Sequence, residues 1–217
     1  HLYGGGQVFV PAFAWVSDIA AILRNGLVPV FADINPRNLC LDEEAVLARL
    51  NRDTRAVFMI HAQGFNGLTE RLLKILEEKG IHLIEDVCEA HGAEFGGRKL
   101  GTFGLASNFS FYFAHHLSTI EGGMICTGDE DFHQTVLMMR SHGLVREATS
   151  EALKQEYARK HPDLAPDFMF AFPSFNFRNT EIGAVLGRSR LKHLERGNAR
   201  RKRNFKLFLE HLDPEKY

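Results

Sequence analysis

The chain has 217 residues, of which 45% are hydrophobic and 24% are charged, a composition that fits one large α/β domain or two small ones and excludes disorder along the whole chain. Its 26 basic and 27 acidic residues give a formal net charge of −1, which provides no general basic field for nucleic acid, and its apolar stretches are too short to cross a bilayer. The three cysteines at 40, 88 and 126 suit neither a disulfide framework nor a zinc ribbon, and they indicate buried thiols in a reducing, cytoplasmic compartment.

Strand and helix patterns alternate in the first half of the chain. Short apolar runs predict strands at 7–11, 27–31, 56–60 and 81–84. Helices are expected at 17–24, 42–50 and 69–79. This alternation predicts βαβ units and a mostly parallel sheet. Ligands of such sheets bind beyond the carboxyl ends of the strands, so the residues after Ile60 and Ile84 are the first candidates for a site.

The second half of the chain has a less regular pattern. Strands are predicted at 106–113 and 122–126. Helices are predicted at 132–141 and, as one long helix, at 180–212. The polar residues 146–168 favour a loop or a short helix. The long helix carries a basic run from Arg196 to Lys206 with Phe205 as its aromatic partner, which favours a solvated face or a subunit contact over a nucleic-acid site.

The first polar cluster is the segment Glu85–Gly92, which follows the fourth predicted strand. Asp86 ends an apolar strand, so its carboxylate is expected in the crevice beyond the sheet edge. An Asp at a strand–helix turn also serves as a helix N-cap, and this interpretation stays open. Asp86, Glu89 and His91 lack the spacing of a compact metal-binding signature, so no metal site is expected.

Two further clusters lie later in the chain. The segment 109–123 contains an adjacent pair, His115 and His116, after the aromatic strand. One histidine of such a pair is commonly structural, and no spacing rule tells which. The turn before the last predicted helix carries Asn176 and Arg178, where turn chemistry and a surface arginine are an alternative explanation. The residues alone therefore indicate an α/β enzyme with a crevice and leave the reaction open.

Taken in order, these clusters resemble the DegT/DnrJ/EryC1/StrS sugar aminotransferase family, whose members use pyridoxal phosphate on keto sugars attached to nucleoside diphosphates. The resemblance spans about residues 7–200, through motifs at Val10–Trp15, Asn25–Asp33, Glu85–Ala93, Gly101–Gly104, Phe109–Phe111, Glu121–Gly123, Arg140–Gly143 and Phe175–Glu181. It implies an α/β aspartate aminotransferase (type I) fold with a mostly parallel sheet flanked by helices. In that fold, residues 1–190 would be a truncated large domain without its N-terminal phosphate loop. Residues 191–217 would be a long helix leading to an absent small C-terminal domain.

One position departs from the aminotransferases of that family. They carry a lysine six residues before the Glu of the Glu-Gly-Gly motif, where it forms the internal Schiff base, and this chain has His115 there. The family's deoxysugar 3-dehydratases carry histidine at that position. Imidazole has no primary amine to hold pyridoxal as an imine, while its unperturbed pKa of roughly 6.5 suits proton transfer.

The resemblance therefore implies a specific reaction and its partners. The C3 hydroxyl would be removed from a nucleotide-linked 4-keto-6-deoxyhexose, with GDP-4-keto-6-deoxy-D-mannose favoured. Glutamate would convert pyridoxal phosphate to pyridoxamine phosphate, and His115 would be the catalytic base. The alternatives are a family member that acts on a CDP sugar and a catalytically inactive homologue. A Cys-ligated iron–sulfur cluster is not expected, because Cys126 is the single cysteine between the His-His and Asn-Phe-Arg motifs.

The resemblance also assigns binding residues by position. Trp15 would stack on the cofactor ring, Asp86 would pair with the pyridine nitrogen, Glu89 would contact the ring hydroxyl and Ser110 would bind the phosphate. Asn176 would reach the phosphate of the neighbouring subunit, which implies a homodimer with a shared active site. Arg178 would bind a carboxylate or diphosphate of the substrate.

Overall fold

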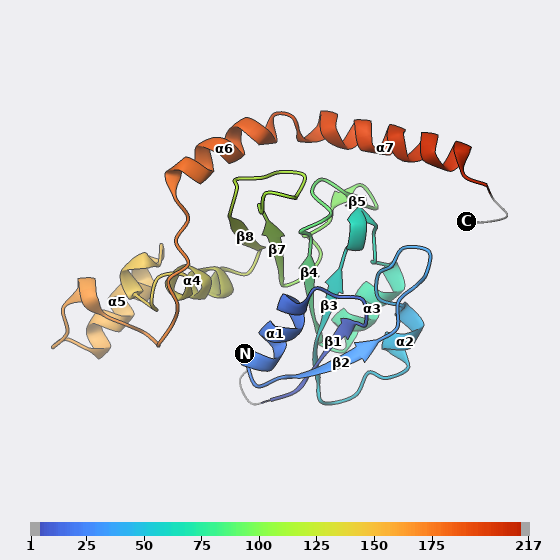
Figure 1. Cartoon of the computed structure of the whole chain (residues 1–217). Helices are drawn as coiled ribbons and strands as arrows, with labels where there is room; N and C mark the ends of the chain where they lie inside the picture. Colours follow the sequence, from blue (N-terminus) through green and yellow to red (C-terminus); the bar gives the residue numbers. More distant parts are fainter. Residues whose placement is uncertain (1–4, 214–217) are drawn as a thin grey trace. The chain divides into compact units, whose positions relative to one another are not determined.

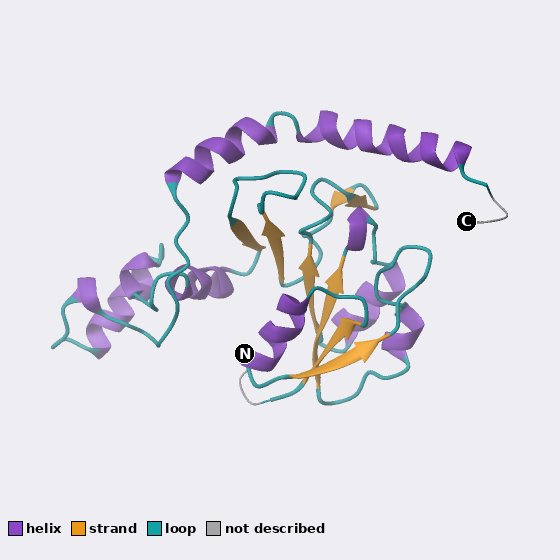
Figure 2. Cartoon of the chain, viewed as in Figure 1, coloured by secondary structure: helices purple, strands orange, loops and turns teal. Residues whose placement is uncertain are grey.

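The computed structural model describes residues 5–213, which form two compact units. The first unit comprises the residues up to Cys126 together with those from Glu181 onward, and the second comprises residues 127–180. Figure 1 traces the chain from blue to red, and Figure 2 distinguishes its helices from its strands. No helix within the described range is long and apolar enough to cross a membrane.

A six-stranded sheet in the order β2-β1-β3-β4-β7-β8 forms the centre of the first unit. Its strands are β1 (Gln7–Pro11), β2 (Val28–Ala32), β3 (Thr54–Ile60), β4 (His82–Asp86), β7 (Ala106–Ser110) and β8 (Gly123–Thr127). β1 pairs in parallel with β2 and β3, and β4 pairs in parallel with β3 and β7. This pairing confirms the predicted α/β fold with a mostly parallel sheet.

Short helices connect the strands. They are α1 (Val16–Arg24), α2 (Glu43–Leu47), the 3-10 turn η1 (Ala62–Gly64) and α3 (Glu70–Glu78), and a hairpin of β5 (Glu94–Phe95) and β6 (Arg98–Lys99) follows β4. The side chain of Asp42 accepts the N–H of Ala45 at 2.9 Å, and that of Thr69 accepts the N–H of Leu72 at 3.0 Å, so both begin their helices as N-caps. α1 begins after Trp15 without a side-chain cap.

Two apolar cores cover the two faces of the sheet, because successive side chains of a strand alternate between faces. On one face Phe9, Val57 and Met59 are fully buried and pack with residues of α2 and α3. On the other face Val8 packs with Ile22 of α1. Figure 1 shows α1 on one side of the strands and α3 on the other. Burial on both faces explains the continuous apolar runs from which the strands were predicted.

The prediction of one long helix at 180–212 is wrong, because the structure has two helices there. They are α6 (Glu181–Leu191) and α7 (Leu194–His211). Residues 192–193 form a turn in which the His193 N–H donates to the carbonyl of Arg190 at 2.9 Å. Neither Pro nor Gly occurs at this break, so the sequence pattern contained no signal for it.

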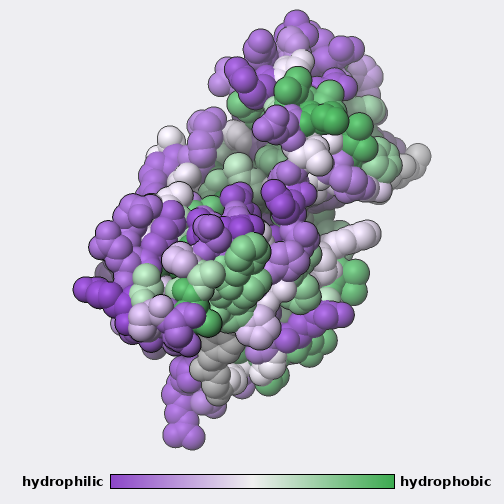
Figure 3. All heavy atoms as spheres, turned by 90° about the vertical axis from the view of Figure 1, so that its left-hand side faces the viewer, coloured by the Kyte–Doolittle hydropathy of each residue, from purple (hydrophilic) through white to green (hydrophobic). Residues whose placement is uncertain are grey.

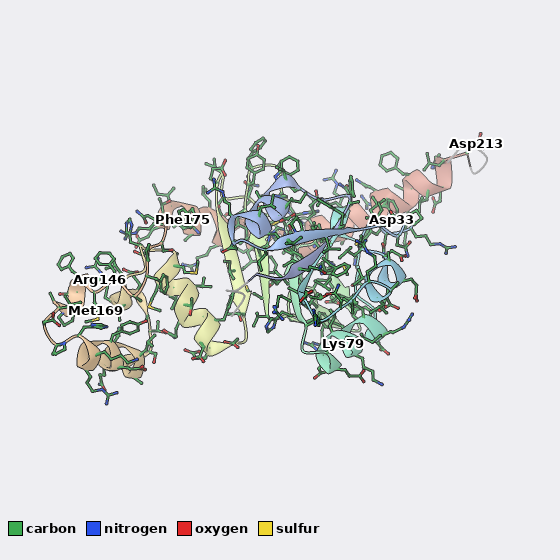
Figure 4. The ribbon with its side chains drawn as sticks, turned by 90° about the horizontal axis from the view of Figure 1, so that it is seen from below. Asp33, Lys79, Arg146, Met169, Phe175 and Asp213 are labelled. Carbon is green, nitrogen blue, oxygen red and sulfur yellow. The ribbon has the colours of Figure 1, made fainter. Side chains whose placement is uncertain are left out.

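The second unit is small and mainly helical, with an apolar cluster of Met138, Val145, Ala148 and Met169. Its elements are α4 (Glu130–Met139), η2 (Val145–Glu147), α5 (Glu151–Lys160) and η3 (Pro166–Phe168). Oε1 of the buried Gln134 accepts the N–H groups of Thr149 and Ser150 at 2.8 and 3.1 Å, which ties α4 to the start of α5. Arg146 and Met169, labelled in Figure 4, both belong to this unit.

Candidate active site

The carboxyl ends of β3, β4 and β7 meet at one edge of the sheet in the first unit. Parallel register places Asp86 opposite Ile60 on one side and Asn108 on the other. Asp86 is 8% exposed, and its Oδ1 accepts the N–H of Cys88 at 2.8 Å. Residues 87–93 form turns and no helix begins there, so the helix-cap interpretation of Asp86 is wrong. The carboxylate instead ends β4 at the edge where parallel sheets bind ligands.

Glu89 is fixed by the turn that follows β3. Its Oε2 accepts the N–H of Gln63 at 2.7 Å. Gln63 has a φ of 54°, a left-handed conformation that is uncommon for a residue other than glycine. At the start of the same turn, the N–H of His61 donates to the carbonyl of Asp86 at 3.0 Å. The turn after β3 therefore contacts both of the acids that were predicted to bind the cofactor.

Glu85 precedes the last residue of β4 and is fully buried. Its carboxylate accepts four hydrogen bonds of 2.8–3.2 Å, from the N–H groups of Gly101, Phe103 and Gly104 and from Nε2 of His61. Nδ1 of His61 accepts the N–H of Gly67 at 3.3 Å, so the proton of this ring lies on Nε2. Burial alone would raise the pKa of Glu85, but the four hydrogen bonds outweigh it and hold the pKa below its usual value. Glu85 is therefore an ionised anchor between β4 and the loop 101–104.

Asp18 lies in the first turn of α1 and is 5% exposed. Its carboxyl group is in hydrogen-bonding contact with that of Asp86, while its Oδ2 is buried without a donor from the described residues. Burial raises the pKa of Asp18 to about 7, and the charge of Asp86 and the contact with it act in the same direction. Below pH 7 the Asp18 carboxyl group therefore largely keeps its proton.

Three histidines gather near the carboxyl end of β7. His91 is 6% exposed, and the centroid of its ring lies 6.3 Å from that of His115 and 6.0 Å from that of His116. Burial lowers the pKa of His91 to about 4, the two neighbouring rings contribute, and Asp86 acts in the opposite direction. Burial also lowers the pKa of His116, with contributions from Arg201 and His115. At neutral pH His91 and His116 are therefore largely uncharged.

His115 lies in the loop between β7 and β8 and is half-buried. Its N–H donates to the carbonyl of Tyr112 at 3.0 Å, and the two ring centroids are 6.1 Å apart. The N–H of Phe111 donates to the carbonyl of Gly122 at 2.8 Å and closes the loop at its base. The loop therefore holds the His115 ring beside the buried His91, outside the apolar cores.

Ser110 and Trp15 occupy the ends of two elements. The strand predicted at 106–113 ends at Ser110, where the chain enters the loop and the serine Oγ accepts the N–H of Tyr112 at 3.3 Å. Trp15 directly precedes α1, and its carbonyl accepts the N–H of Asp18 at 3.2 Å. Its side chain is 75% exposed, so the indole offers a face to a planar ligand.

Asn176 and Arg178 belong to the second unit. An antiparallel bridge pairs Asn176 with Ser141, and the N–H of His142 donates to the carbonyl of Phe175 at 2.7 Å. Phe175 is labelled in Figure 4. Both predicted side chains are exposed. The backbone of this segment is therefore fixed, while Asn176 and Arg178 are accessible for binding.

Asp18 and Glu85 were not among the predicted site residues. Asp18 lies four residues before the buried Ile22 and on the same face of α1, so helical spacing alone could have placed an acid on the apolar face. The donors to Glu85 come from the loop 101–104, which no local pattern connects to β4. Within residues 5–213, no group of three or more His, Cys, Asp or Glu side chains is arranged to hold a metal ion.

Known proteins resemble this chain in sequence and in fold. The GDP-4-keto-6-deoxy-D-mannose 3-dehydratase of Escherichia coli is 31% identical over 217 residues, which is 100% of this chain and 56% of that protein. The enzyme of the same name from Yersinia pseudotuberculosis is 31% identical over 207 residues, or 95% of this chain and 52% of that protein. The L-glutamine:2-deoxy-scyllo-inosose aminotransferase of Streptomyces kanamyceticus is 33% identical over 216 residues, or 94% of this chain and 46% of that protein. The chain thus spans about half the length of these relatives.

Solved structures agree with these relationships. The E. coli GDP-4-keto-6-deoxy-D-mannose-3-dehydratase with bound hydrated pyridoxal phosphate matches with a TM-score of 0.84 and 30% identity, over 95% of this chain and 53% of that one. The 3-amino-5-hydroxybenzoic acid synthase matches with a TM-score of 0.81 and 26% identity, over 96% and 51%. These likenesses confirm the aminotransferase fold expected from the motifs. Because the family model of the DegT/DnrJ/EryC1/StrS aminotransferases matches residues 2–215, the chain belongs to this family.

Proposed function

We propose that this protein is a 3-dehydratase that uses pyridoxal phosphate and pyridoxamine phosphate to remove the C3 hydroxyl from a nucleotide-linked 4-keto-6-deoxyhexose. GDP-4-keto-6-deoxy-D-mannose is the favoured substrate and glutamate the amino donor. The observation that carries this proposal is His115, an imidazole where the family's aminotransferases have lysine, held beside His91 in a loop that follows β7. Two relatives named GDP-4-keto-6-deoxy-D-mannose 3-dehydratase support the substrate class.

Unpartnered polar atoms in the first unit fit such a cofactor. Among the described residues, buried side-chain nitrogen and oxygen atoms without a hydrogen-bond partner occur on Asp18, His91 and His116. Buried polar atoms normally have partners, so those of Asp18 and His91, two residues that interact with Asp86, mark a place where a polar ligand completes the structure. Asp86 offers a carboxylate to a protonated ring nitrogen, and Trp15 offers an exposed indole for stacking.

The residues around Asp86 have distinct tasks in this proposal. When bound, the cofactor supplies the amine that reacts with the C4 ketone and a ring that accepts electrons. Asp86 holds the proton on the ring nitrogen, because a nearby carboxylate favours the positively charged form. Oε2 of Glu89 is engaged by a main-chain N–H, which leaves Oε1 for the ring hydroxyl. Ser110 binds the phosphate, and Trp15 covers one face of the ring.

His115 moves the protons. It would take a proton from the C4′ carbon of the bound cofactor and give one to the C3 hydroxyl as the bond between C3 and that oxygen breaks, so that water leaves, since an imidazole exchanges protons readily near neutral pH. His91 beside it is largely uncharged at neutral pH, so it places no positive charge next to the His115 ring. Because an imidazole has no primary amine, the cofactor is held without a covalent bond to the protein, and nitrogen leaves as ammonia.

We also propose a homodimer in which Asn176 reaches the cofactor phosphate of the neighbouring subunit and Arg178 binds the substrate. α6 buries none of its residues and exposes Ile182, Val185 and Leu191 by 75%, 66% and 59%, which is typical of a helix covered by another chain. Figure 3 shows hydrophobic residues, in green, on the face of the molecule that is turned toward the viewer. Light scattering should give the mass of two chains, and a monomer would contradict the shared site.

The three cysteines are free thiols, which supports a cytoplasmic location.

The variant His115→Asn tests the role of the imidazole. Asn has no group that titrates near neutral pH, so turnover of the GDP-linked keto sugar should fall by at least about a hundredfold. Cofactor binding should persist, as followed by the fluorescence of Trp15, the single tryptophan of the chain. The matched variant His133→Asn replaces an exposed histidine of the second unit and should change neither quantity. Full turnover by His115→Asn would contradict the proposal.

A further inference from the structure

Asp18 and Asp86 bring two carboxyl groups together in the interior of the first unit. They are 5% and 8% exposed, and their side chains are in hydrogen-bonding contact. Two carboxylates only accept hydrogen bonds, so this contact requires a proton on one of them. We propose that Asp18 is a positioning residue, a neutral carboxylic acid that donates a hydrogen bond to Asp86 and leaves the pair's single negative charge on Asp86. That this negative charge then pairs with the ring nitrogen of the cofactor rests on the proposed function.

The positions of the two residues in the fold explain why they meet. Ile84 and Ile60 pack with the core that α1 covers, and Asp86 follows Ile84 by two residues on the same face of β4. Asp18 precedes Ile22 of that core by one helical turn. α1 therefore places Asp18 over the end of β4. Because α1 begins directly after Trp15, one helix start positions both the stacking indole and the partner of Asp86.

The surroundings of the pair favour one charge over two. Among the described residues, Asp18 also interacts with the thiol of Cys88, whose pKa is raised by burial and by both acids. His91, which interacts with Asp86, is buried with a pKa of about 4 and brings no positive charge at neutral pH. A second carboxylate would therefore be buried without a compensating cation, which is unfavourable.

Asp86, rather than Asp18, is the carboxyl group suited to carry the charge. Its Oδ1 accepts the main-chain N–H of Cys88, a hydrogen bond that stabilises the ionised form. Oδ2 of Asp18 is buried and receives no donor from the described residues. An acid without donors remains protonated more readily than one that accepts an N–H. The asymmetry assigns the proton to Asp18 and the charge to Asp86.

The first test follows the stability of the full chain without cofactor as a function of pH. The pKa of Asp18 is raised from 3.8 to about 7 in the folded chain, so its stabilising contribution is complete below pH 4 and is lost as the pH rises through 7. Asn cannot ionise, so the variant Asp18→Asn lacks this loss. The melting temperature of Asp18→Asn relative to the wild type should rise by at least about 5 °C between pH 5 and pH 8.

The matched control is Asp163→Asn, which removes an exposed acid and should follow the wild-type profile at every pH. Parallel profiles of the wild type and Asp18→Asn between pH 5 and pH 8 would overturn the proposal. This measurement needs neither cofactor nor substrate. It therefore tests the acid pair separately from the proposed dehydratase activity, whose failure would show instead as missing product.

The second test asks whether the hydrogen bond positions Asp86. Asp18→Leu removes the donor, and binding of pyridoxal phosphate, measured by the fluorescence of Trp15, should weaken about tenfold. Asp18→Asn keeps an N–H donor of similar shape and should bind within about threefold of the wild type. Equal binding by Asp18→Leu and Asp18→Asn would overturn the positioning role. If Asp18→Leu does not fold, binding by Asp18→Asn that is weakened tenfold or more would overturn it as well.

Discussion

Glu85 and Asp86 are adjacent at the end of β4, and their surroundings differ completely. The carboxylate of Glu85 accepts four hydrogen bonds and is ionised at neutral pH. Asp86, on the other face of the strand, accepts an N–H from Cys88 and faces a second acid, Asp18. The hydrogen bonds of Glu85 are satisfied within the protein, whereas Asp86 interacts with Asp18 and His91, which have buried polar atoms without a partner in the described part of the chain. In this molecule, the buried and fully hydrogen-bonded Glu85 stabilises the fold, whereas buried polar groups that lack partners mark the candidate site.

The largest effect on stability is expected from removing the charge of Glu85. In Glu85→Gln an amide NH2 faces main-chain N–H donors, so the free energy of unfolding should fall by about 2–4 kcal/mol. Urea unfolding at pH 7 measures it. The matched variant Glu77→Gln removes an exposed acid of α3 and should cost less than about 0.5 kcal/mol. Equal losses of unfolding free energy in the two variants would show that the four hydrogen bonds of Glu85 do not stabilise the fold.

The next effect is the pH dependence of stability that the buried His91 causes at the candidate site. The pKa of His91 is lowered from 6.5 to about 4, so the folded chain binds fewer protons than the unfolded chain between these values. Its contribution to stability is therefore complete above pH 6.5 and is lost as the pH falls toward 4, by up to about 3 kcal/mol. Urea unfolding of His91→Leu should lack this loss between pH 7 and pH 4.5. A slope identical to that of the wild type would show that His91 is not buried in its neutral form.

The smallest effect is the stability of the same variant at neutral pH. Both ring nitrogens of His91 are buried without a hydrogen-bond partner among residues 5–213, so Leu removes unsatisfied polar atoms. The free energy of unfolding should stay constant or rise by up to about 1 kcal/mol, the opposite sign to Glu85→Gln. Affinity for pyridoxal phosphate should fall at the same time. A loss of unfolding free energy above about 2 kcal/mol would show instead that His91 stabilises the fold, as Glu85 does.

Local patterns predicted the elements that neighbouring residues determine. The strands of the parallel sheet follow from apolar runs, and the place of Asp86 follows from the end of one such run. The break between α6 and α7 could not be predicted, because the turn at 192–193 contains no helix-breaking residue. The strand predicted to 113 ends at Ser110, because the loop to β8 begins there.

The electrostatics of the candidate site could not be predicted from local sequence. Glu85 receives its main-chain donors from the loop 101–104, and two strands and two α-helices of intervening chain separate Asp18 from Asp86. Such contacts depend on the register of the sheet and on the face that α1 buries. The sequence motifs indicated His115 and Asp86 as candidates, and the structure added Asp18, which contacts Asp86, and His91, which lies beside His115.

The identity of the sugar product tests the central claim most directly. The protein would be incubated with the GDP-linked 4-keto-6-deoxy sugar, pyridoxal phosphate and glutamate, and the products would be analysed by mass spectrometry together with an assay for ammonia. We expect a sugar that has lost its C3 hydroxyl, with one ammonia released for each molecule formed. An amino sugar without free ammonia would contradict the account, because it would show that His115 leaves transamination intact.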